Sequence, residues 1–448
     1  MPVQRFAPSL RLLPLLLAMG VGGVSFSAQA QSLVDLYTAA RGYDAAYQSA
    51  KLQFDATLAK ADQAQALLLP TVGLSAGVNQ INQDSQQPIS KNYSYDSESA
   101  TIAVSQPLYR PANYASYEQG KKSAYLAQAQ LASAEQDLIV RVSQAYFDVL
   151  ASSDTLEFVK TQKTAVGEQL ASAKRNFEVG TSTITDSREA QARFDLVVAQ
   201  ELAAENDLLV KRLALNNVVG QANAQPKPLA TPVALSPVQP ADVGLWVDQS
   251  QATHPGVVQA DIALQVAKLE TAKAEAGHKP TLDLTGSYTA AATNNGSSTG
   301  VVSTRGNQAS VGLSFNMPLF AGYAIQNRVK ETVALEEKAR NDLEAARRTV
   351  AQATRTAYFG LQSGLAQVNA LQAAETSSQS ALDANKLGYQ VGVRINIDVL
   401  NSQSQLFDTK AKLAKARYDV LLGGLKLRQA NGSLKAEDLQ AINRQLAP

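Results

Sequence analysis

The sequence has no cysteine and only two histidines, and these shortages exclude several kinds of site. Without cysteine there is no disulfide framework, no thiolate metal site and no lipid anchor on an N-terminal cysteine. His254 directly precedes Pro255, and His278 lies two residues before Pro280. Neither has a partner at the spacing of a helical metal site, so we expect them to cap or join elements. There is also no glycine-rich phosphate loop and no nucleophile paired with a base. We therefore expect no enzymatic activity, no metal and no cofactor.

A charge surplus is missing as well. The 40 Lys and Arg residues balance 39 Asp and Glu residues, which gives nucleic-acid binding no electrostatic support. One marked apolar run, 12–21, follows Arg5 and Arg11 and precedes Ala28-Gln29-Ala30, the pattern of a cleavable signal peptide over 1–30. No later stretch is apolar enough for a membrane helix, so an exported chain of this kind is either free outside the cytoplasm or forms a β-barrel.

The sequence does contain a long internal duplication. Its period of about 200 residues is far longer than that of a solenoid and indicates two copies of one fold. The copies are predicted at 31–220 and 244–432, with a connector at 221–243 and a C-terminal tail at 433–448. The matching motifs are Pro70-Thr71 with Pro280-Thr281, Pro107-Leu108-Tyr109 with Pro318-Leu319-Phe320, Ala145-Tyr146-Phe147 with Ala357-Tyr358-Phe359, Val179-Gly180 with Val391-Gly392, and Gly220 with Gly432.

Each copy is predicted to begin with a helix that a proline ends, over 32–69 and 245–277. The pattern then switches to an alternation of apolar with small or polar residues, which predicts strands over 71–79, 101–108, 281–288 and 310–317. Strongly polar stretches at 80–96 and 291–308 predict loops. Aromatic residues near the strand ends suit a membrane-interface girdle, although tyrosines beside loops also occur in soluble sandwiches: Tyr93, Tyr95, Tyr109, Tyr288, Phe320 and Tyr323.

A very long helix comes next in each copy. The stretch 113–177 has no proline, and its alanine and leucine residues form the stripe of a coiled-coil seam. At 1.5 Å per residue such a helix is roughly 100 Å long. Val179-Gly180 and Val391-Gly392 predict tight turns, after which shorter helices return, the first over 186–219. Five prolines in the connector exclude a helix there and leave an extended segment, either an equatorial belt around the helices or a free linker.

The predicted strands raise a problem of closure. Strands of about 9 to 11 residues suit a tilted crossing of an outer membrane, but four of them cannot close a barrel. Open edges are not tolerated in hydrocarbon, because every backbone amide there needs a partner. We therefore predict that identical chains complete the wall, with eight strands in a dimer or twelve in a trimer. The alternative is a soluble strand layer on a helical stalk.

The order of these elements resembles the TolC family of outer-membrane export channels over essentially the whole mature chain. The resemblance implies an α+β fold in which a homotrimer forms a 12-strand transmembrane β-barrel, four strands per chain, continuous with a long α-helical coiled-coil tunnel in the periplasm. The stretches that carry the resemblance are Arg175-Asn176-Phe177-Glu178-Val179-Gly180 with Ile184-Thr185-Asp186, Gly277-His278-Lys279-Pro280-Thr281-Leu282-Asp283-Leu284-Thr285, and Gly388-Tyr389-Gln390-Val391-Gly392-Val393-Arg394 with Asp398-Val399-Leu400.

The resemblance also implies a function. The chain would be the outer-membrane exit duct of a tripartite efflux pump or a type I secretion system in a Gram-negative cell, passively conducting drugs, small molecules or polypeptides. Its partners would be two further copies, a periplasmic adaptor (membrane-fusion) protein, an inner-membrane pump of the RND, ABC or MFS type, and outer-membrane lipid. The alternative is a periplasmic coiled-coil adaptor or structural protein without a barrel.

The resemblance further implies a gate latch at the periplasmic tip. Arg394 and Tyr389 of the second copy would bond to Asp186 and Thr185 of the first. A guanidinium and a phenol both donate hydrogen bonds to a carboxylate, so the residue types suit such a latch. The alternative is an ordinary surface ion pair at a helical turn.

The resemblance implies two more features of the entrance. Asp398 matches one ring of entrance aspartates, whereas Asn401 is a substitution at the position of a second ring. Three carboxylates facing one another favour cations, so we expect a milder cation preference than a double ring gives. The tip turns at Val179, Gly180, Val391 and Gly392 would contact the adaptor.

Overall fold

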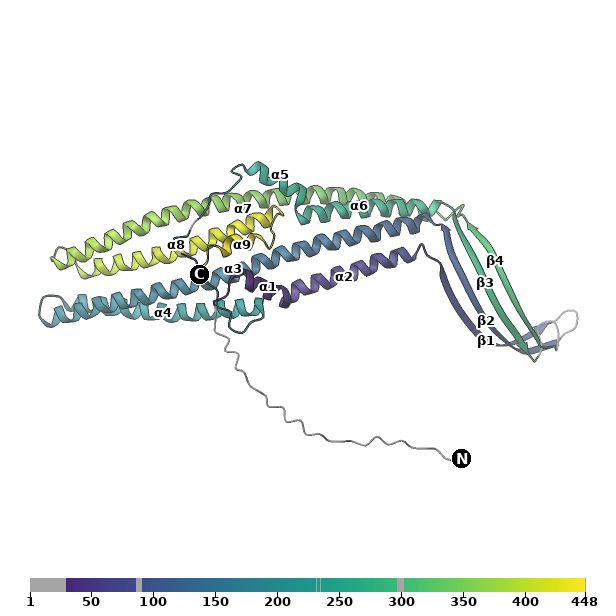
Figure 1. Cartoon of the computed structure of the whole chain (residues 1–448), viewed down its shortest axis with the longest axis horizontal. Coiled ribbons are helices and arrows are strands. Elements are labelled where there is room, and N and C mark those ends of the chain that lie inside the picture. Colours follow the sequence, from purple (N-terminus) through teal and green to yellow (C-terminus); the bar gives the residue numbers. More distant parts are fainter. Residues whose placement is uncertain (1–29, 86–90, 231, 234, 296–301, 448) are drawn as a thin grey trace, which may run out of the picture.

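The structure is a computed structural model that describes residues 30–85, 91–230, 232–233, 235–295 and 302–447. The predicted signal peptide at 1–30 lies outside these ranges, apart from its last residue. Helices form a long bundle, and four strands extend from one end of it at an angle (Figure 1). Within the described ranges, no helix combines the length and the apolar character that a membrane crossing needs.

The same order of elements occurs twice along the chain. The first copy contains α1 (Leu33–Tyr43), α2 (Ala45–Ala66), β1 (Thr71–Ser85), β2 (Lys91–Tyr109), α3 (Pro111–Glu178) and α4 (Ile184–Val219). The second contains α5 (Val243–Thr253), α6 (Pro255–Glu275), the short 3-10 helix η1 (Ala276–His278), β3 (Thr281–Asn294), β4 (Thr304–Asn316), α7 (Ala324–Gln390) and α8 (Asn396–Ala430). A final helix, α9, covers Asp438–Asn443.

The first helix of each copy is broken in two, where the sequence predicts one continuous helix. Asp44 ends α1 and caps α2, because its carboxylate accepts the Tyr47 N–H at 2.8 Å. Both oxygens of this carboxylate also bind Arg141 of α3, each at 2.9 Å. His254 caps α6 in the same way, with Nδ1 accepting the Gly256 N–H at 3.0 Å, which confirms its predicted capping role. Helical spacing does not reveal the break at Asp44, which depends on the bonds of the capping side chain, whereas Pro255 at the start of α6 marks the second break in the sequence.

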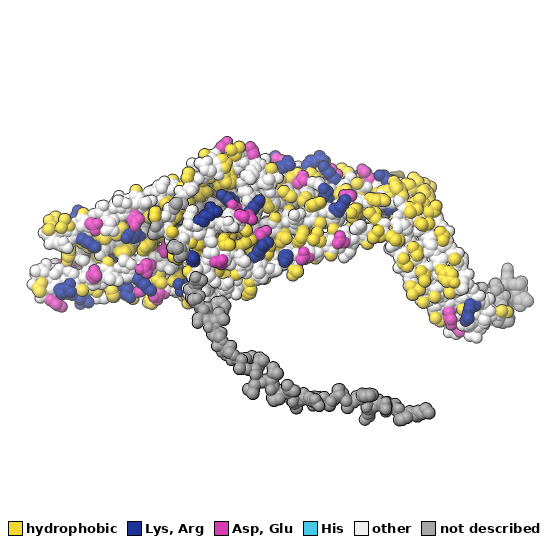
Figure 2. Space-filling model, viewed as in Figure 1, with side chains coloured by type: hydrophobic (Ala, Val, Ile, Leu, Met, Phe, Trp, Pro, Cys, Tyr) yellow, Lys and Arg dark blue, Asp and Glu magenta, His cyan; other side chains and the backbone are white. Residues whose placement is uncertain are grey.

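The four strands form one antiparallel sheet in the order β1-β2-β3-β4. Its register places apolar residues of all four strands on one face, and these side chains are exposed, up to 83% for Val311. Figure 2 shows hydrophobic side chains gathered over the strands and where the strands join the helices. The apolar face is made of Val72, Leu74, Ile102, Val104, Leu284, Tyr288, Val311 and Leu313.

The strands are longer than the sequence predicts, with 13 to 19 residues each, and they continue into the stretches predicted to be loops. Polar pairs across the ladder support these extensions. The hydroxyls of Thr293 and Thr304 lie 2.8 Å apart, and the Asn294 amide donates to Glu98 at 3.2 Å. Cross-strand pairs of this kind stabilise a sheet without any apolar alternation, so the alternation marks only part of each strand.

The predicted aromatic girdle is present in part. Tyr109, Phe320 and Tyr323 are exposed beside strand ends, and the rings of the last two pack edge to face at 5.5 Å. Tyr95 is buried, and Tyr288 lies within β3 rather than at its end, because the strand is longer than predicted. The side chain of Tyr93 lies outside the described part of the structure.

The helices below the sheet form two long antiparallel hairpins, α3 with α4 and α7 with α8, and α3 also packs against α8 (Figure 1). The largest apolar core lies near the middle of the bundle, where α1, α3, α4, α8 and α9 contribute Leu33, Leu138, Leu215, Leu422 and Leu439. The hairpin ends far from the sheet are the predicted periplasmic tips.

The connector between the copies lies against this middle region. The Tyr146 hydroxyl of α3 donates to the Lys227 carbonyl at 2.7 Å, and the Tyr358 hydroxyl of α7 donates to the Ala241 carbonyl. The repeated Ala-Tyr-Phe motif thus fastens both ends of the connector. These parts of the connector therefore lie against α3 and α7, and its role as an equatorial belt stays a prediction.

Candidate functional site at the hairpin tips

The first tip turns through a glycine-dependent helix end. After α3, Gly180 has φ +77°, a left-handed conformation that glycine adopts without a Cβ clash. The Gly180 N–H donates to the Phe177 carbonyl at 3.0 Å, and the Thr181 N–H donates to the Asn176 carbonyl at 2.8 Å. These two bonds form a Schellman motif, which satisfies the last carbonyls of the helix.

The second tip repeats this turn after α7. Gly392 has φ +78°, its N–H donates to the Tyr389 carbonyl at 3.1 Å, and the Val393 N–H donates to the Gly388 carbonyl at 2.9 Å. Both turns present apolar side chains to solvent, since Val179 is 72% and Val391 is 65% exposed. The two tips are therefore alike in their turns.

The return helices begin differently. In the first tip Thr183 caps α4 through a capping box: its hydroxyl accepts the Asp186 N–H at 3.2 Å, and Asp186 Oδ2 accepts the Thr183 N–H at 3.0 Å. The hydroxyls of Ser182 and Thr183 also donate to Oδ2, each at 2.8 Å. Burial raises the pKa of Asp186, but the hydrogen bonds from Thr183 and Ser182 outweigh it, so the pKa lies below its ordinary value.

The second tip has no such cap. Ile395 occupies the N-cap position of α8 and has no side-chain hydrogen bond to offer. Asp398, the counterpart of Asp186, instead lies 3.6 Å from the Arg394 guanidinium. The charge of Asp398, the predicted entrance carboxylate, is thus balanced by Arg394 beside the start of the same helix.

The four predicted latch residues do not bond to one another within the protomer. The Tyr389 hydroxyl accepts from the Asn176 amide at 3.3 Å, and the carboxylate of Asp186 serves its own helix cap. Thr185 is exposed, and among the described contacts neither Tyr389 nor Arg394 reaches it or Asp186. The latch between these second-copy and first-copy residues stays a prediction.

Other residues join the two hairpins at this level. The Arg193 guanidinium of α4 donates to Asn401 Oδ1 of α8 at 2.8 Å. Asn396, at the start of α8, accepts from the Gln169 amide of α3 and donates to the Asp186 carbonyl at 3.4 Å. Neither Arg193 nor Asn396 is predicted from the sequence, because a lone arginine or asparagine on a helix forms no motif. Asn401 is more than a substituted position, since it accepts a hydrogen bond from a charged group.

Comparison with known proteins agrees with this architecture. The outer membrane efflux protein family matches residues 36–221 and 246–433, once in each copy. The chain is 35% identical over 433 residues to outer membrane protein TolC of Vibrio cholerae, covering 97% of this chain and 98% of that protein. It is 29% identical over 420 residues to the alkaline protease secretion protein AprF of Pseudomonas aeruginosa, covering 92% and 87%. Among solved structures, the outer membrane protein VceC of Vibrio cholerae matches with a TM-score of 0.77 at 18% identity, covering 90% and 96%.

These matches confirm the predicted fold class and the outer-membrane location. They also confirm the predicted function as an efflux or type I secretion channel, and none of them favours the alternative of a periplasmic adaptor without a barrel. The chain therefore belongs to the outer membrane efflux protein family, a family of outer-membrane channels and not of enzymes.

Proposed function

We propose that three copies of this chain assemble into one exit duct for efflux or type I secretion. The sheet is the observation that carries this proposal. In the described protomer β1 and β4 each have one edge without a strand partner, and one face of the sheet carries a continuous apolar and exposed area over its half nearer the helices. In lipid those edges need hydrogen-bond partners, which the same strands of neighbouring copies can supply.

Three copies place twelve strands in the wall, whereas two copies place eight. The likeness to the TolC family supports the trimer, because that resemblance implies three chains in one channel. In this assembly the apolar face of the sheet contacts lipid. The opposite face, which carries small and polar residues such as Gly73, Ser75, Ser287 and Ser310, lines the lumen. The helices continue the duct as a tunnel in the periplasm.

The hairpin tips are the proposed docking region for a periplasmic adaptor. They lie at the end of the molecule opposite the sheet (Figure 1), and their turns expose Val179, Val391 and Val393. An inner-membrane pump of the RND, ABC or MFS type would supply the energy, and the duct itself would conduct passively. The name of the relative AprF refers to secretion of a protease, which supports polypeptide secretion beside drug efflux.

The entrance is proposed to be gated between neighbouring protomers. Arg394 and Tyr389 of one protomer would bond to Asp186 and Thr185 of the next, and Asp398 would face its two copies across the opening. Arg394 would have to leave its present partner Asp398 to complete the latch, at small cost, because exposed ion pairs contribute about 0–1 kcal/mol.

Purified mature protein in detergent and in planar bilayers tests the proposal. Light scattering coupled to size-exclusion chromatography is expected to give three chains per particle, and bilayers are expected to show discrete conductance steps. A deletion strain tested on a panel of antibiotics, together with an assay of secreted proteins, would then separate efflux from secretion. A water-soluble monomer that never permeabilises vesicles would overturn the proposal.

A further inference from the structure

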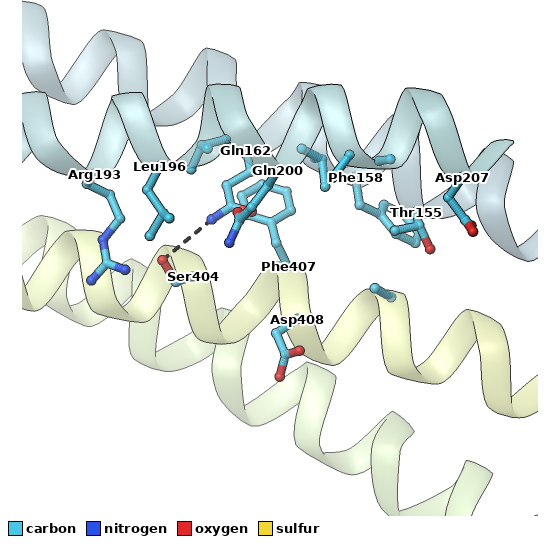
Figure 3. A pocket seen from close by; sticks show the side chains of 15 residues that line it. Thr155, Phe158, Gln162, Arg193, Leu196, Gln200, Asp207, Ser404, Phe407 and Asp408 are labelled. Atoms are coloured by element: carbon cyan, nitrogen blue, oxygen red, sulfur yellow. Dashed lines mark hydrogen bonds between the residues drawn. The ribbon is translucent and has the colours of Figure 1, made fainter. Parts of the chain in front are cut away.

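The two hairpins of the protomer meet near the tips over a small area. Leu400 of α8 is fully buried against the first hairpin, in an apolar cluster with Val166, Leu170, Ala173, Ala190 and Val197. Beyond this cluster α3, α4 and α8 line an open cavity of about 530 Å³, so α4 and α8 do not pack closely on each other there (Figure 3). The contact of α4 with α8 near the tips is thus separated from the main core in the middle of the bundle.

One charged bond crosses between the hairpins beside this cavity. Figure 3 shows Arg193 at one end of the cavity, extending from α4 toward α8. Its Nη2 donates to Asn401 Oδ1 at 2.8 Å. The other described hydrogen bonds between the hairpins near the tips join neutral groups: Gln169 with Asn396, Asn396 with the Asp186 carbonyl, Asn176 with Tyr389, and Gln162 with Ser404.

We propose that Arg193 and Asn401 form a clamp within each protomer that holds the closed entrance and breaks when it opens. The proposal rests on the channel function proposed above and adds a positioning residue, Arg193, to it. Because the cavity separates α8 from α4 just beyond the clamp, α8 can move away from α4 while the middle core stays intact. The clamp is the strongest polar contact that such a movement breaks, since hydrogen bonds from ionised donors are stronger than neutral ones.

The neutral partner makes this clamp releasable. An amide at 401 gives an ion–dipole contact on an exposed part of the helices, whereas a carboxylate there would form an ion pair. Asn401 also adds no negative charge to the entrance, and Arg193 brings a positive one beside it. The contact therefore determines both how firmly the hairpins are joined and how acidic the entrance is.

The Arg193→Gln variant tests the clamp in planar bilayers. It is expected to raise the ratio of open to closed time roughly two- to fivefold, the range of an exposed charged contact. Arg193→Lys, which keeps a charged donor, is expected to restore most of the original ratio. Arg193→Gln is also expected to shift the reversal potential in a salt gradient toward cation preference, a change that a purely structural role would not produce.

Asn401→Asp tests the same contact in the opposite direction. The ion pair with Arg193 is expected to lower the open fraction, and in the double variant with Arg193→Gln this gain in closure is expected to disappear, as in a double-mutant cycle. Lys415→Gln is the matched control, because Lys415 pairs with Asp419 at 2.7 Å within α8 and spans no hairpin contact. Its open fraction is expected to equal that of the unaltered protein.

Amide hydrogen exchange makes the clamp testable apart from conduction. In detergent-solubilised full-length mature protein, Arg193→Gln is expected to speed exchange at 396–404 relative to Lys415→Gln. Unchanged exchange overturns the clamp, whether or not the protein conducts. Faster exchange in Arg193→Gln with an unchanged open fraction also overturns the role of the clamp in gating. If the protein without substitutions never conducts, that result counts against the proposed channel function instead.

Discussion

The two tips share one turn and differ in the start of the return helix. Both long helices end in a Schellman motif with glycine at a positive φ, and both return helices carry an aspartate in their first turn. In the first tip Thr183 caps the helix together with Asp186. In the second tip Ile395 cannot cap, and Asp398 lies beside Arg394 instead. The residue at the N-cap position thus decides whether the repeated aspartate caps its helix or forms an ion pair.

This difference assigns unequal roles to the hairpins. The carboxylate of Asp186 in the first tip takes part in a helix cap through Oδ2, so a latch bond to it is made beside that cap. The second tip has a charged pair that can exchange partners without loss of a helix cap. We therefore expect gating changes to concentrate in the second hairpin, and variants of the two tips test that expectation, from the largest effect to the smallest.

The largest effect is expected from the double variant Arg394→Ser with Tyr389→Phe. It removes the donors of the proposed latch in all three protomers, and at up to about 1 kcal/mol for each exposed contact the open fraction is expected to rise roughly tenfold or more. Single-channel recording in planar bilayers measures it. The counterpart positions in the first tip provide the control, Ser182→Ala with Phe177→Leu, which is expected to change conduction far less. Equal effects in both tips would remove the asymmetry.

A smaller change is expected when the Asp398 carboxylate is removed. Asp398→Ala deletes the proposed entrance ring, so block by multivalent cations added from the periplasmic side is expected to weaken several-fold, on the order of one lost charge contact per protomer. Titration of the blocking cation in bilayers gives the apparent affinity. Asp186→Ala is the matched variant in the first tip. If cation block persisted in Asp398→Ala and was lost in Asp186→Ala, the entrance ring would be formed by Asp186 and not by Asp398.

Exchanging the caps changes helix stability and leaves the turns intact. Ile395→Thr is expected to install a capping box with Asp398 and to stabilise the start of α8 by about 1 kcal/mol, while Thr183→Ala is expected to cost α4 a similar amount. Hydrogen exchange of the first turns, 184–187 and 396–399, measures both. If Ile395→Thr left the exchange of α8 unchanged, the missing cap would not explain the difference between the tips.

The smallest effect concerns pH. The folded-state pKa of Asp186 lies below its ordinary value of 3.8, so its capping box contributes stability that is fully present above about pH 4 and is lost as the pH falls through the folded-state pKa. Exchange at 184–187, corrected for the intrinsic pH dependence, is expected to rise in that range. Asp186→Asn is expected to abolish the pH dependence. A transition above pH 5 would contradict the lowered pKa.

Much of the architecture can be predicted from local patterns. The sequence predicts the long helix over 113–177, and α3 covers Pro111–Glu178. Val179-Gly180 and Val391-Gly392 identify both turns, because few residues other than glycine adopt a positive φ without strain. The apolar alternation locates every strand, although polar cross-strand pairs extend the strands beyond it.

The contacts at the tip cannot be predicted in this way. The break at Asp44 depends on a side-chain bond to a backbone amide, and a continuous helix has the same spacing, whereas Pro255 marks the break at His254. Arg193 and Asn401 lie on different hairpins, so no local motif brings them together. The resemblance indicates which positions surround the entrance, but the bond that each side chain makes depends on the packing of α4 against α8.

The fastening of the connector has a mechanical consequence. Tyr146 and Tyr358 bind the connector to the midpoints of α3 and α7. From these two residues each helix continues for roughly 50 Å to its tip. A helix that is held at its middle pivots about the connector. A tilt of only about 5° there displaces a tip by roughly 4 Å, so a partner that grips the tips can shift them by several ångström through a slight rotation about the connector.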